Sequence, residues 1–156
     1  MRYTATLLAV RDMERSKRFY YEVMGLEVVA DFGANVTLTG GIALQTVDTW
    51  AKFIRRANNE IIFQSNAAEL YFEEDRIDDF AAKLAATPNL VYVHPLLEHS
   101  WGQRVVRFYD PDGHIIEVGE NIALVVRRFL DSGLSVKETA VRMDVPEDYV
   151  QACLRP

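Results

Sequence analysis

Two segments of the chain share one pattern, a glycine turn followed by an apolar strand with a polar side chain four residues beyond the last glycine. In the first segment Gly41 leads to Gln45. In the second Gly113 leads to Glu117, each residue 72 positions beyond its counterpart. The second turn, Asp110–Gly113 with sequence Asp-Pro-Asp-Gly, favours a hairpin because proline presets φ and glycine accepts a positive φ. A carboxylate in an apolar strand needs a partner or a purpose. The repeat therefore predicts a site built from two related halves.

The elements upstream of each hairpin repeat as well. In the first half we expect a strand at 6–10, a helix from Met13 to Gly25 capped by Asp12, and strands at 26–32, 35–39 and 42–46. In the second half we expect a strand at 69–72, a helix from about Arg76, and strands near 92–94, 104–109 and 115–118. A period of this length is too long for a solenoid and indicates a duplicated module.

The run from Val10 to Tyr20, followed by Met24-Gly25-Leu26, resembles the opening of glyoxalase/bleomycin-resistance/dioxygenase proteins, the vicinal-oxygen-chelate superfamily. The segment from Phe108 to Glu117 resembles the hairpin that closes their second module. The resemblance implies an α+β fold of two tandem βαβββ modules that curl around a shared cleft, often with a divalent metal held by four strands. The superfamily includes lyases, epimerases, extradiol dioxygenases, thiol transferases and metal-free drug-binding proteins, so the fold does not settle the function.

The resemblance also sets the expected domain boundaries. We expect a glyoxalase-like domain at 1–120, with modules at 3–47 and 68–119 and a helical linker at 48–67, and a helical C-terminal extension at 121–156.

The composition indicates an ordinary globular protein of a reducing compartment. Hydrophobic residues make up 49% of the chain and charged residues 26%. The net charge of −6 argues against nucleic acid and against a polybasic membrane surface. A single cysteine, Cys153, allows no internal disulfide. The short apolar run at the amino terminus predicts neither a signal peptide nor a membrane span. We expect a cytoplasmic protein.

Strand parity places Ala5, Gln45, Glu69 and Glu117 on the faces turned away from the helices. These positions match the four metal-ligand positions of the family. Ala5 has no donor atom, so at most three oxygen ligands remain, a set that favours weak binding of Mg²⁺ or Mn²⁺ over zinc or nickel. Extradiol dioxygenase chemistry is disfavoured, because alanine and glutamate stand where its two histidines are required. The alternative is that Glu69 and Glu117 are solvated strand carboxylates.

The side chains of the second half provide most of the expected ligand contacts. His99 and Trp101 lie in a glycine-containing loop that could cover the pocket, and His94 could enter it or form its wall. Arg104 and Arg107 fall on opposite strand faces, so at most one points inward, where it could hold an anionic group; both could equally be rim charges. The expected ligand contacts are Leu7, Tyr71, Tyr92, His94, His99, Trp101 and Arg104. His114 has the opposite parity to Glu117, which predicts a structural role.

The tail predicts three helices, an apolar one at 123–130, one capped by Ser135 with a glutamate three residues on, and one from Pro146. The pattern is similar to a helix-turn-helix. Five basic residues are balanced by five acidic ones, and Glu147 and Asp148 open the helix that would face DNA. We therefore expect a packing or dimerisation element and a homodimer.

Two functional classes remain open. The first is a small-molecule binding protein of the bleomycin-resistance type, without an essential transition metal. The second is a metal-dependent lyase or isomerase similar to lactoylglutathione lyase (glyoxalase I), with Glu117 or Glu69 as metal ligand or catalytic base. If these two glutamates face each other without a nearby cation, one has a raised pKa, and Glu117→Gln does not destabilise the unliganded protein.

Overall fold

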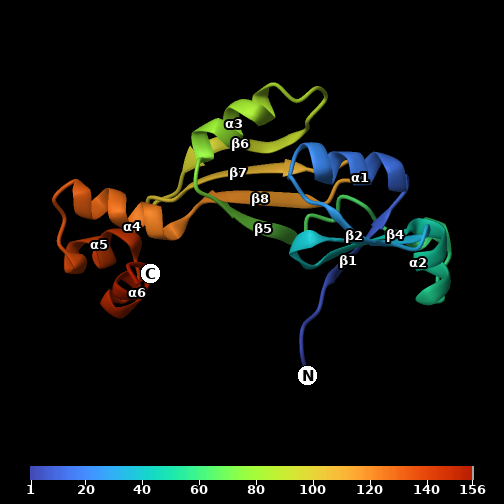
Figure 1. The fold of residues 1–156 in the computed structure, drawn as a ribbon, viewed down its shortest axis with the longest axis horizontal. Coiled ribbons are helices and arrows are strands. Elements are labelled where there is room, and N and C mark those ends of the chain that lie inside the picture. The colour runs from blue at the N-terminus through green and yellow to red at the C-terminus, as the bar shows by residue number, and fades with distance from the viewer. Residues whose placement is uncertain (156) are drawn as a thin grey trace. The chain divides into compact units, whose positions relative to one another are not determined.

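The computed structural model describes residues 1–155 and contains two four-stranded sheets (Figure 1). The first module consists of β1 (Thr6–Val10), α1 (Met13–Glu22), β2 (Val28–Asp31), β3 (Asn35–Leu38) and β4 (Ile42–Thr46). The second consists of β5 (Glu69–Glu74), α3 (Ile77–Ala85), β6 (Tyr92–Glu98), β7 (Arg104–Tyr109) and β8 (Ile115–Glu120). The strand orders, β1-β4-β3-β2 and β5-β8-β7-β6, are equivalent. The predicted duplication and the α+β fold class are confirmed.

Short helical segments connect these elements. A 3₁₀ turn at Thr39–Gly41 precedes β4, and α2 (Val47–Phe53) with a second 3₁₀ turn at Asn58–Glu60 lies between the modules in sequence. The contacts divide the chain into two compact units. The first comprises Met1–Glu69 and Tyr109–Ile115, and the second comprises Leu70–Phe108 and the chain from Ile116 on. The turn between β7 and β8 thus belongs to the first unit, and the C-terminal helices belong to the second.

The β7–β8 turn is held in the first unit by buried polar contacts. Asp12 caps α1 as expected, accepting a hydrogen bond from the backbone three residues on. Tyr20 of α1 is fully buried, and its hydroxyl donates to Asp110 at 2.9 Å. Asp112 accepts the backbone N–H of Arg11 at 3.2 Å. Both turn aspartates are 5% exposed, so these hydrogen bonds satisfy carboxylates that burial would otherwise penalise.

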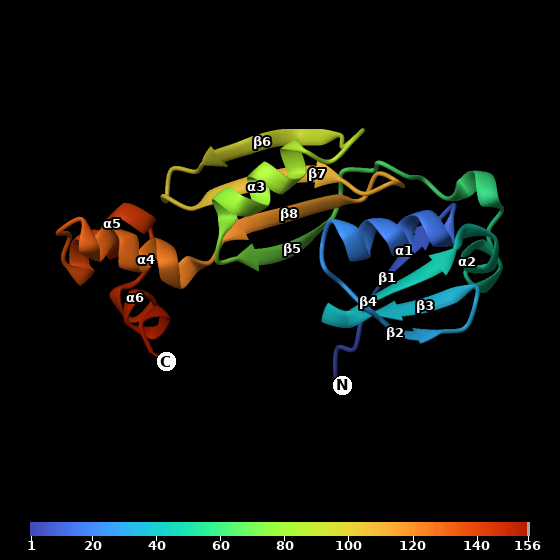
Figure 2. The same ribbon diagram turned by 45° about the horizontal axis from the view of Figure 1, so that its top comes forward.

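In the second unit, α3 lies over one face of its sheet (Figure 2). Alternate strand residues form the buried core on this face, with Val106 and Phe108 from β7 and Ile116 and Val118 from β8. The ring of Phe80 in α3 lies 6.3 Å from that of Phe108. The alternation of side chains along each strand thus places these even-numbered residues of β7 and β8 on the face that α3 covers.

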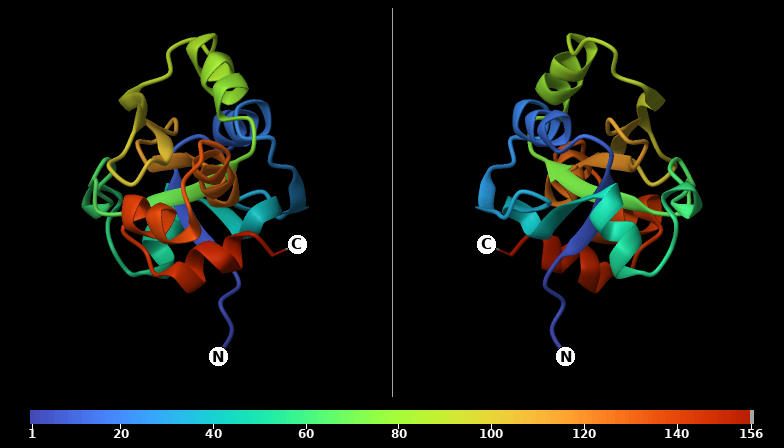
Figure 3. Two further views of the ribbon diagram at one scale, coloured as in Figure 1. Left: turned by 90° about the vertical axis from the view of Figure 1, so that its left-hand side faces the viewer. Right: turned by 90° about the vertical axis from the view of Figure 1, so that its right-hand side faces the viewer.

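Three helices follow β8, as the sequence predicts: α4 (Ile122–Asp131), α5 (Val136–Met143) and α6 (Glu147–Cys153). They gather around one another (Figure 3, orange and red). Ser135 and Glu138 form the expected capping box at the start of α5. The three helices share a hydrophobic core of Val125, Val126, Phe129, Ala140, Met143 and Val150. Within residues 1–155, none of the helices combines the length and apolar character needed to cross a bilayer.

Candidate functional site

In the first unit, the family's metal-ligand positions are Ala5, Gln45 and Glu69. Ala5 precedes β1 and is exposed, and Glu69 is exposed at the start of β5. Gln45 in β4 is 3% exposed. Its Oε1 accepts a hydrogen bond from Asn35 at 2.7 Å, and its Nε2 donates to the hydroxyl of Thr49. Both ends of the Gln45 amide are therefore satisfied within the protein.

Glu117 in the second unit forms an ion pair with Arg107 of β7. The Glu117 side chain is 9% exposed and that of Arg107 is 24% exposed. A buried carboxylate needs a counter-charge, and the guanidinium supplies it. A divalent ion at Glu117 would have to share the carboxylate with this fixed cation, which repels it.

A metal ion thus has little support from these surroundings. Within either unit, the described residues form no group of three or more His, Cys, Asp or Glu that could hold one. The expectation that no transition metal is tightly held stays a prediction. A weakly bound Mg²⁺ or Mn²⁺ at Gln45, Glu69 and Glu117 stays a prediction.

Arg107 also contacts two histidines. It lies opposite His94 of β6 in the strand register, and its Nη1 is 3.2 Å from Nε2 of His94 and 3.3 Å from Nε2 of His99. Because arginine is always protonated, it donates and both Nε2 atoms accept. His94 Nδ1 lies 2.9 Å from the carbonyl oxygen of Pro95, which assigns the proton to Nδ1. Burial lowers the pKa of His99, and the charge of Arg107 lowers it further. We call Arg107, Glu117, His94 and His99 the Arg107 cluster.

A chain of contacts leads away from this cluster. The His99 ring stacks on Trp101 at 4.2 Å between centroids. Trp101 Nε1 donates to Gln103 Oε1 at 3.3 Å, and Gln103 Nε2 donates to the Tyr71 hydroxyl at 3.0 Å. The Tyr71 hydroxyl in turn donates to Glu73 at 3.0 Å. Burial raises the pKa of Tyr71 to about 12, so this hydroxyl remains a donor at neutral pH.

Arg104 lies on the opposite side of the sheet from Arg107. Its Nη1 contacts Asp78 of α3 at 2.9 Å, and its Nη2 contacts Glu120 of β8 at 3.0 Å. Glu120 is 4% exposed and also pairs with Arg128 of α4 at 3.0 Å. Arg104 was the arginine expected to contact ligand. The structure instead places Arg107 beside Glu117 and ties Arg104 to the helix-covered face.

Sequence reasoning did not identify Gln103 or Glu120 as site or network residues, and of the two candidate arginines it placed Arg104, not Arg107, among the expected ligand contacts. The signal for Glu120 was available, because it stands three residues beyond Glu117 and therefore has the opposite parity. Parity also separated the two arginines, but it did not show which of them faces Glu117.

The other predicted contact residues belong partly to the first unit and partly to the second. Leu7 of β1 is 37% exposed in the first unit, and Tyr92 at the start of β6 is 36% exposed in the second. Tyr71 and Trp101 line a pocket in the second unit. His114 Nδ1 lies 2.8 Å from the Asp110 carboxylate, a contact that supports the predicted structural role of this histidine.

This fold, with two equivalent βαβββ modules, defines a member of the vicinal-oxygen-chelate superfamily. The chain belongs to the glyoxalase-like domain family, whose model matches residues 3–123. The match ends within α4, so α5 and α6 lie outside it.

Solved structures agree with this assignment. A protein of unknown function from Agrobacterium tumefaciens str. C58 is 38% identical, with 77% of this chain and 94% of that chain covered and a TM-score of 0.67. A lactoylglutathione lyase from Agrobacterium tumefaciens is 26% identical, with 75% and 91% covered and a TM-score of 0.59. A glyoxalase/bleomycin resistance protein/dioxygenase from Nocardioides shares the fold at 19% identity, 77% and 83% coverage and a TM-score of 0.63. No curated protein matches the chain.

Proposed function

We propose that this chain binds a small organic molecule against the sheet face that carries the Arg107 cluster, without an essential transition metal. The observation that carries the proposal is the ion pair between Arg107 and Glu117. Glu117 stands at the strand position where metal-dependent relatives would use a metal ligand. The permanently charged guanidinium of Arg107 lies beside it. Around it, His94, His99 and the Trp101 ring stacked on His99 offer hydrogen-bonding groups and ring surfaces suited to an organic ligand.

A second candidate is a metal-dependent lyase or isomerase, with Glu117 or Glu69 as metal ligand or base. The identity of 26% to a lactoylglutathione lyase over 75% of this chain favours it. The two candidates differ in their response to divalent ions.

The test is thermal unfolding of the purified protein in chelator and in Mg²⁺, Mn²⁺, Zn²⁺ and Ni²⁺. An ion raises the unfolding midpoint only if it binds the folded state preferentially. Because Arg107 already pairs with Glu117, we expect the wild-type midpoint to shift by less than about 1 °C with any ion. Removing the guanidinium with Arg107→Met exposes the Glu117 carboxylate, so this variant should gain stability from Mn²⁺. Arg104→Met, on the opposite sheet face, is the matched control and should show no such gain.

Ligand binding itself is tested by ligand-observed NMR with a library of small organic molecules. Molecules that show a binding signal with the wild type should no longer show it with Arg107→Met, and should still show it with Arg104→Met. A stoichiometric metal that survives dialysis, is lost in Glu117→Gln and supports formation of lactoylglutathione would overturn the proposal and establish the lyase.

We further propose a cytoplasmic homodimer, consistent with the single Cys153. Light scattering after size-exclusion chromatography separates a monomer of 17.8 kDa from a species of twice that mass.

A further inference from the structure

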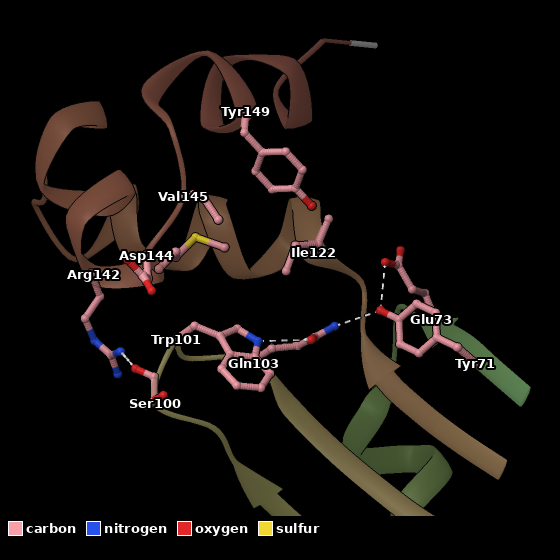
Figure 4. A pocket seen from close by; sticks show the side chains of 11 residues that line it. Tyr71, Glu73, Ser100, Trp101, Gln103, Ile122, Arg142, Asp144, Val145 and Tyr149 are labelled. Atoms are coloured by element: carbon pink, nitrogen blue, oxygen red, sulfur yellow. Dashed lines mark hydrogen bonds between the residues drawn. The ribbon is translucent and has the colours of Figure 1, made fainter. Parts of the chain in front are cut away.

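A pocket of about 680 Å³ opens in the second unit where the C-terminal helices meet the sheet (Figure 4). Tyr71 and Glu73 of β5 line one end, and Trp101 lines the side formed by the loop after β6. Asp144 and Tyr149 belong to the wall formed by the C-terminal helices. The family match ends at residue 123, so this wall is an addition to the glyoxalase-like domain.

The helices hold the loop that carries Trp101 at several points. A β-carbon on Gly102 would lie 2.2 Å from Cζ of Phe129 in α4, so the loop backbone approaches this ring as closely as glycine alone allows. Arg128 donates a hydrogen bond of 2.6 Å to the carbonyl oxygen of Gly102. Arg142 of α5 donates to the carbonyl oxygen of Ser100. The walls of the pocket are therefore fixed by specific contacts.

The pocket combines aromatic surface with negative charge. Trp101, Tyr71 and Tyr149 present three rings, and Met143 and Val145 add apolar surface. The faces of such rings attract cations through the ring quadrupole.

The charged side chains of the pocket lining differ in whether they already form an ion pair. Arg142 already pairs with Glu98 at 3.3 Å, outside the lining. Glu73 accepts a hydrogen bond from Tyr71, and among residues 1–155 neither Glu73 nor Asp144 forms an ion pair. Burial raises the pKa of Tyr149 on the opposite wall, and the charges of Cys153 and then of Glu73 raise this pKa further.

We infer that this pocket is a second ligand site, which binds a small molecule with an aromatic or aliphatic body and a positively charged amine or ammonium group. The rings and apolar side chains receive the body. The carboxylate of Glu73, at the end of the pocket beside Tyr71, faces the cation, and Asp144, at the other end, adds negative charge to the lining (Figure 4). The inference does not rest on the proposed function: the two share only Trp101, which stacks on His99, and the charges that would hold the cation, Glu73 and Asp144, lie outside the Arg107 cluster.

The test uses three probes that share a phenylalkyl body and differ in charge: 2-phenylethylammonium, 2-phenylethanol and 3-phenylpropanoate. The chain has two tryptophans, so a Trp50→Phe background leaves Trp101 as the only fluorophore of its kind. Titrations at low salt are followed by Trp101 fluorescence and by calorimetry. We expect the ammonium to bind about tenfold more tightly than the alcohol, a difference typical of a cation–π contact with an adjacent carboxylate, and the carboxylate to bind most weakly.

Two variants assign the charge preference to the pocket. Glu73→Gln should bring the ammonium and the alcohol to within about threefold. Asp144→Asn removes the second charge without new backbone strain, because asparagine tolerates the left-handed conformation found there (φ 55°). Glu74→Gln, the neighbouring residue on the other face of β5, is the matched control and should preserve the tenfold preference.

Equal affinity for the ammonium and the alcohol would overturn the inference. So would a preference that survives both Glu73→Gln and Asp144→Asn. Binding that is lost with Arg107→Met but kept with both acidic variants would assign the ligand to the Arg107 cluster, supporting the proposed function and rejecting this second site. Circular dichroism and thermal unfolding of each variant verify that it is folded.

Discussion

Arg107 of β7 forms an ion pair with Glu117 of β8, the carboxylate that occupies one of the family's metal-ligand positions. The sequence suggested that Glu117 would face Glu69 and be strained by like charge if no cation stood nearby. Arg107 is such a cation. The condition for repulsion is therefore not met, and the expected effect of Glu117→Gln on stability changes sign.

We predict that Glu117→Gln and Arg107→Met each lower the free energy of unfolding by about 1–3 kcal/mol. Breaking a fully buried pair costs more, but Arg107 is 24% exposed and retains partial hydration. The double variant should lose less than the sum of the single losses, because the second change no longer leaves a charge unpaired. Urea unfolding measures all four proteins, and strict additivity would contradict the coupling.

A second prediction concerns the buried turn of the first unit. Asp110 accepts hydrogen bonds from the backbone N–H groups of Asp112 and His114, both at 2.9 Å, and from the Tyr20 hydroxyl. Asp110→Ala leaves these buried donors unsatisfied and should cost about 2–4 kcal/mol. Asp110→Asn keeps an acceptor oxygen and should cost less. Thermal unfolding compares the two, and equal losses would show that the acceptor is unimportant.

The pH dependence of stability tests the pairing of Glu120. Burial alone would raise the pKa of this carboxyl, but hydrogen bonds from Arg104 and Arg128 outweigh it and lower the pKa below the ordinary value of 4.5. The stabilisation is therefore complete above pH 4.5 and is lost as the pH falls toward the folded-state pKa.

Accordingly, Glu120→Gln should be less stable than the wild type at pH 7, and the difference should shrink below pH 4.5. Urea unfolding at several pH values from 7 to 3.5 measures it. A difference independent of pH would mean that Glu120 contributes through packing rather than charge.

The fourth prediction addresses the contact between the β6–β7 loop and α4. Gly102→Ala places a methyl group against Phe129 at a positive φ of 91°, which should cost about 2–4 kcal/mol and free the loop. Acrylamide should then quench Trp101 more strongly in the Trp50→Phe background. Gly133→Ala is the control, since its φ of 99° gives similar strain while its β-carbon meets nothing within 4 Å. If acrylamide quenches Trp101 equally in both variants, the Phe129 contact does not position the loop.

Local chemistry in the sequence accounts for much of the fold. The strands at 6–10, 42–46 and 104–109 have the predicted bounds, and the caps at Asp12 and Ser135 are formed as expected. Alternation and capping act over a few residues, so they can be read without knowing the partner. The repetition of the pattern then determined the two modules.

The partners of the charged side chains depended on the assembled sheet. Strand parity placed Arg104 and Arg107 on opposite faces, but the pairing with Glu117 and with Glu120 follows from the strand order β5-β8-β7-β6. In the same way, the apolar stripes of the tail predicted helices without showing that Gly102 packs on Phe129. Strand order and helix docking bring together residues far apart in sequence. The chain's local preferences leave such pairings open, and the packing of the whole unit selects one of them.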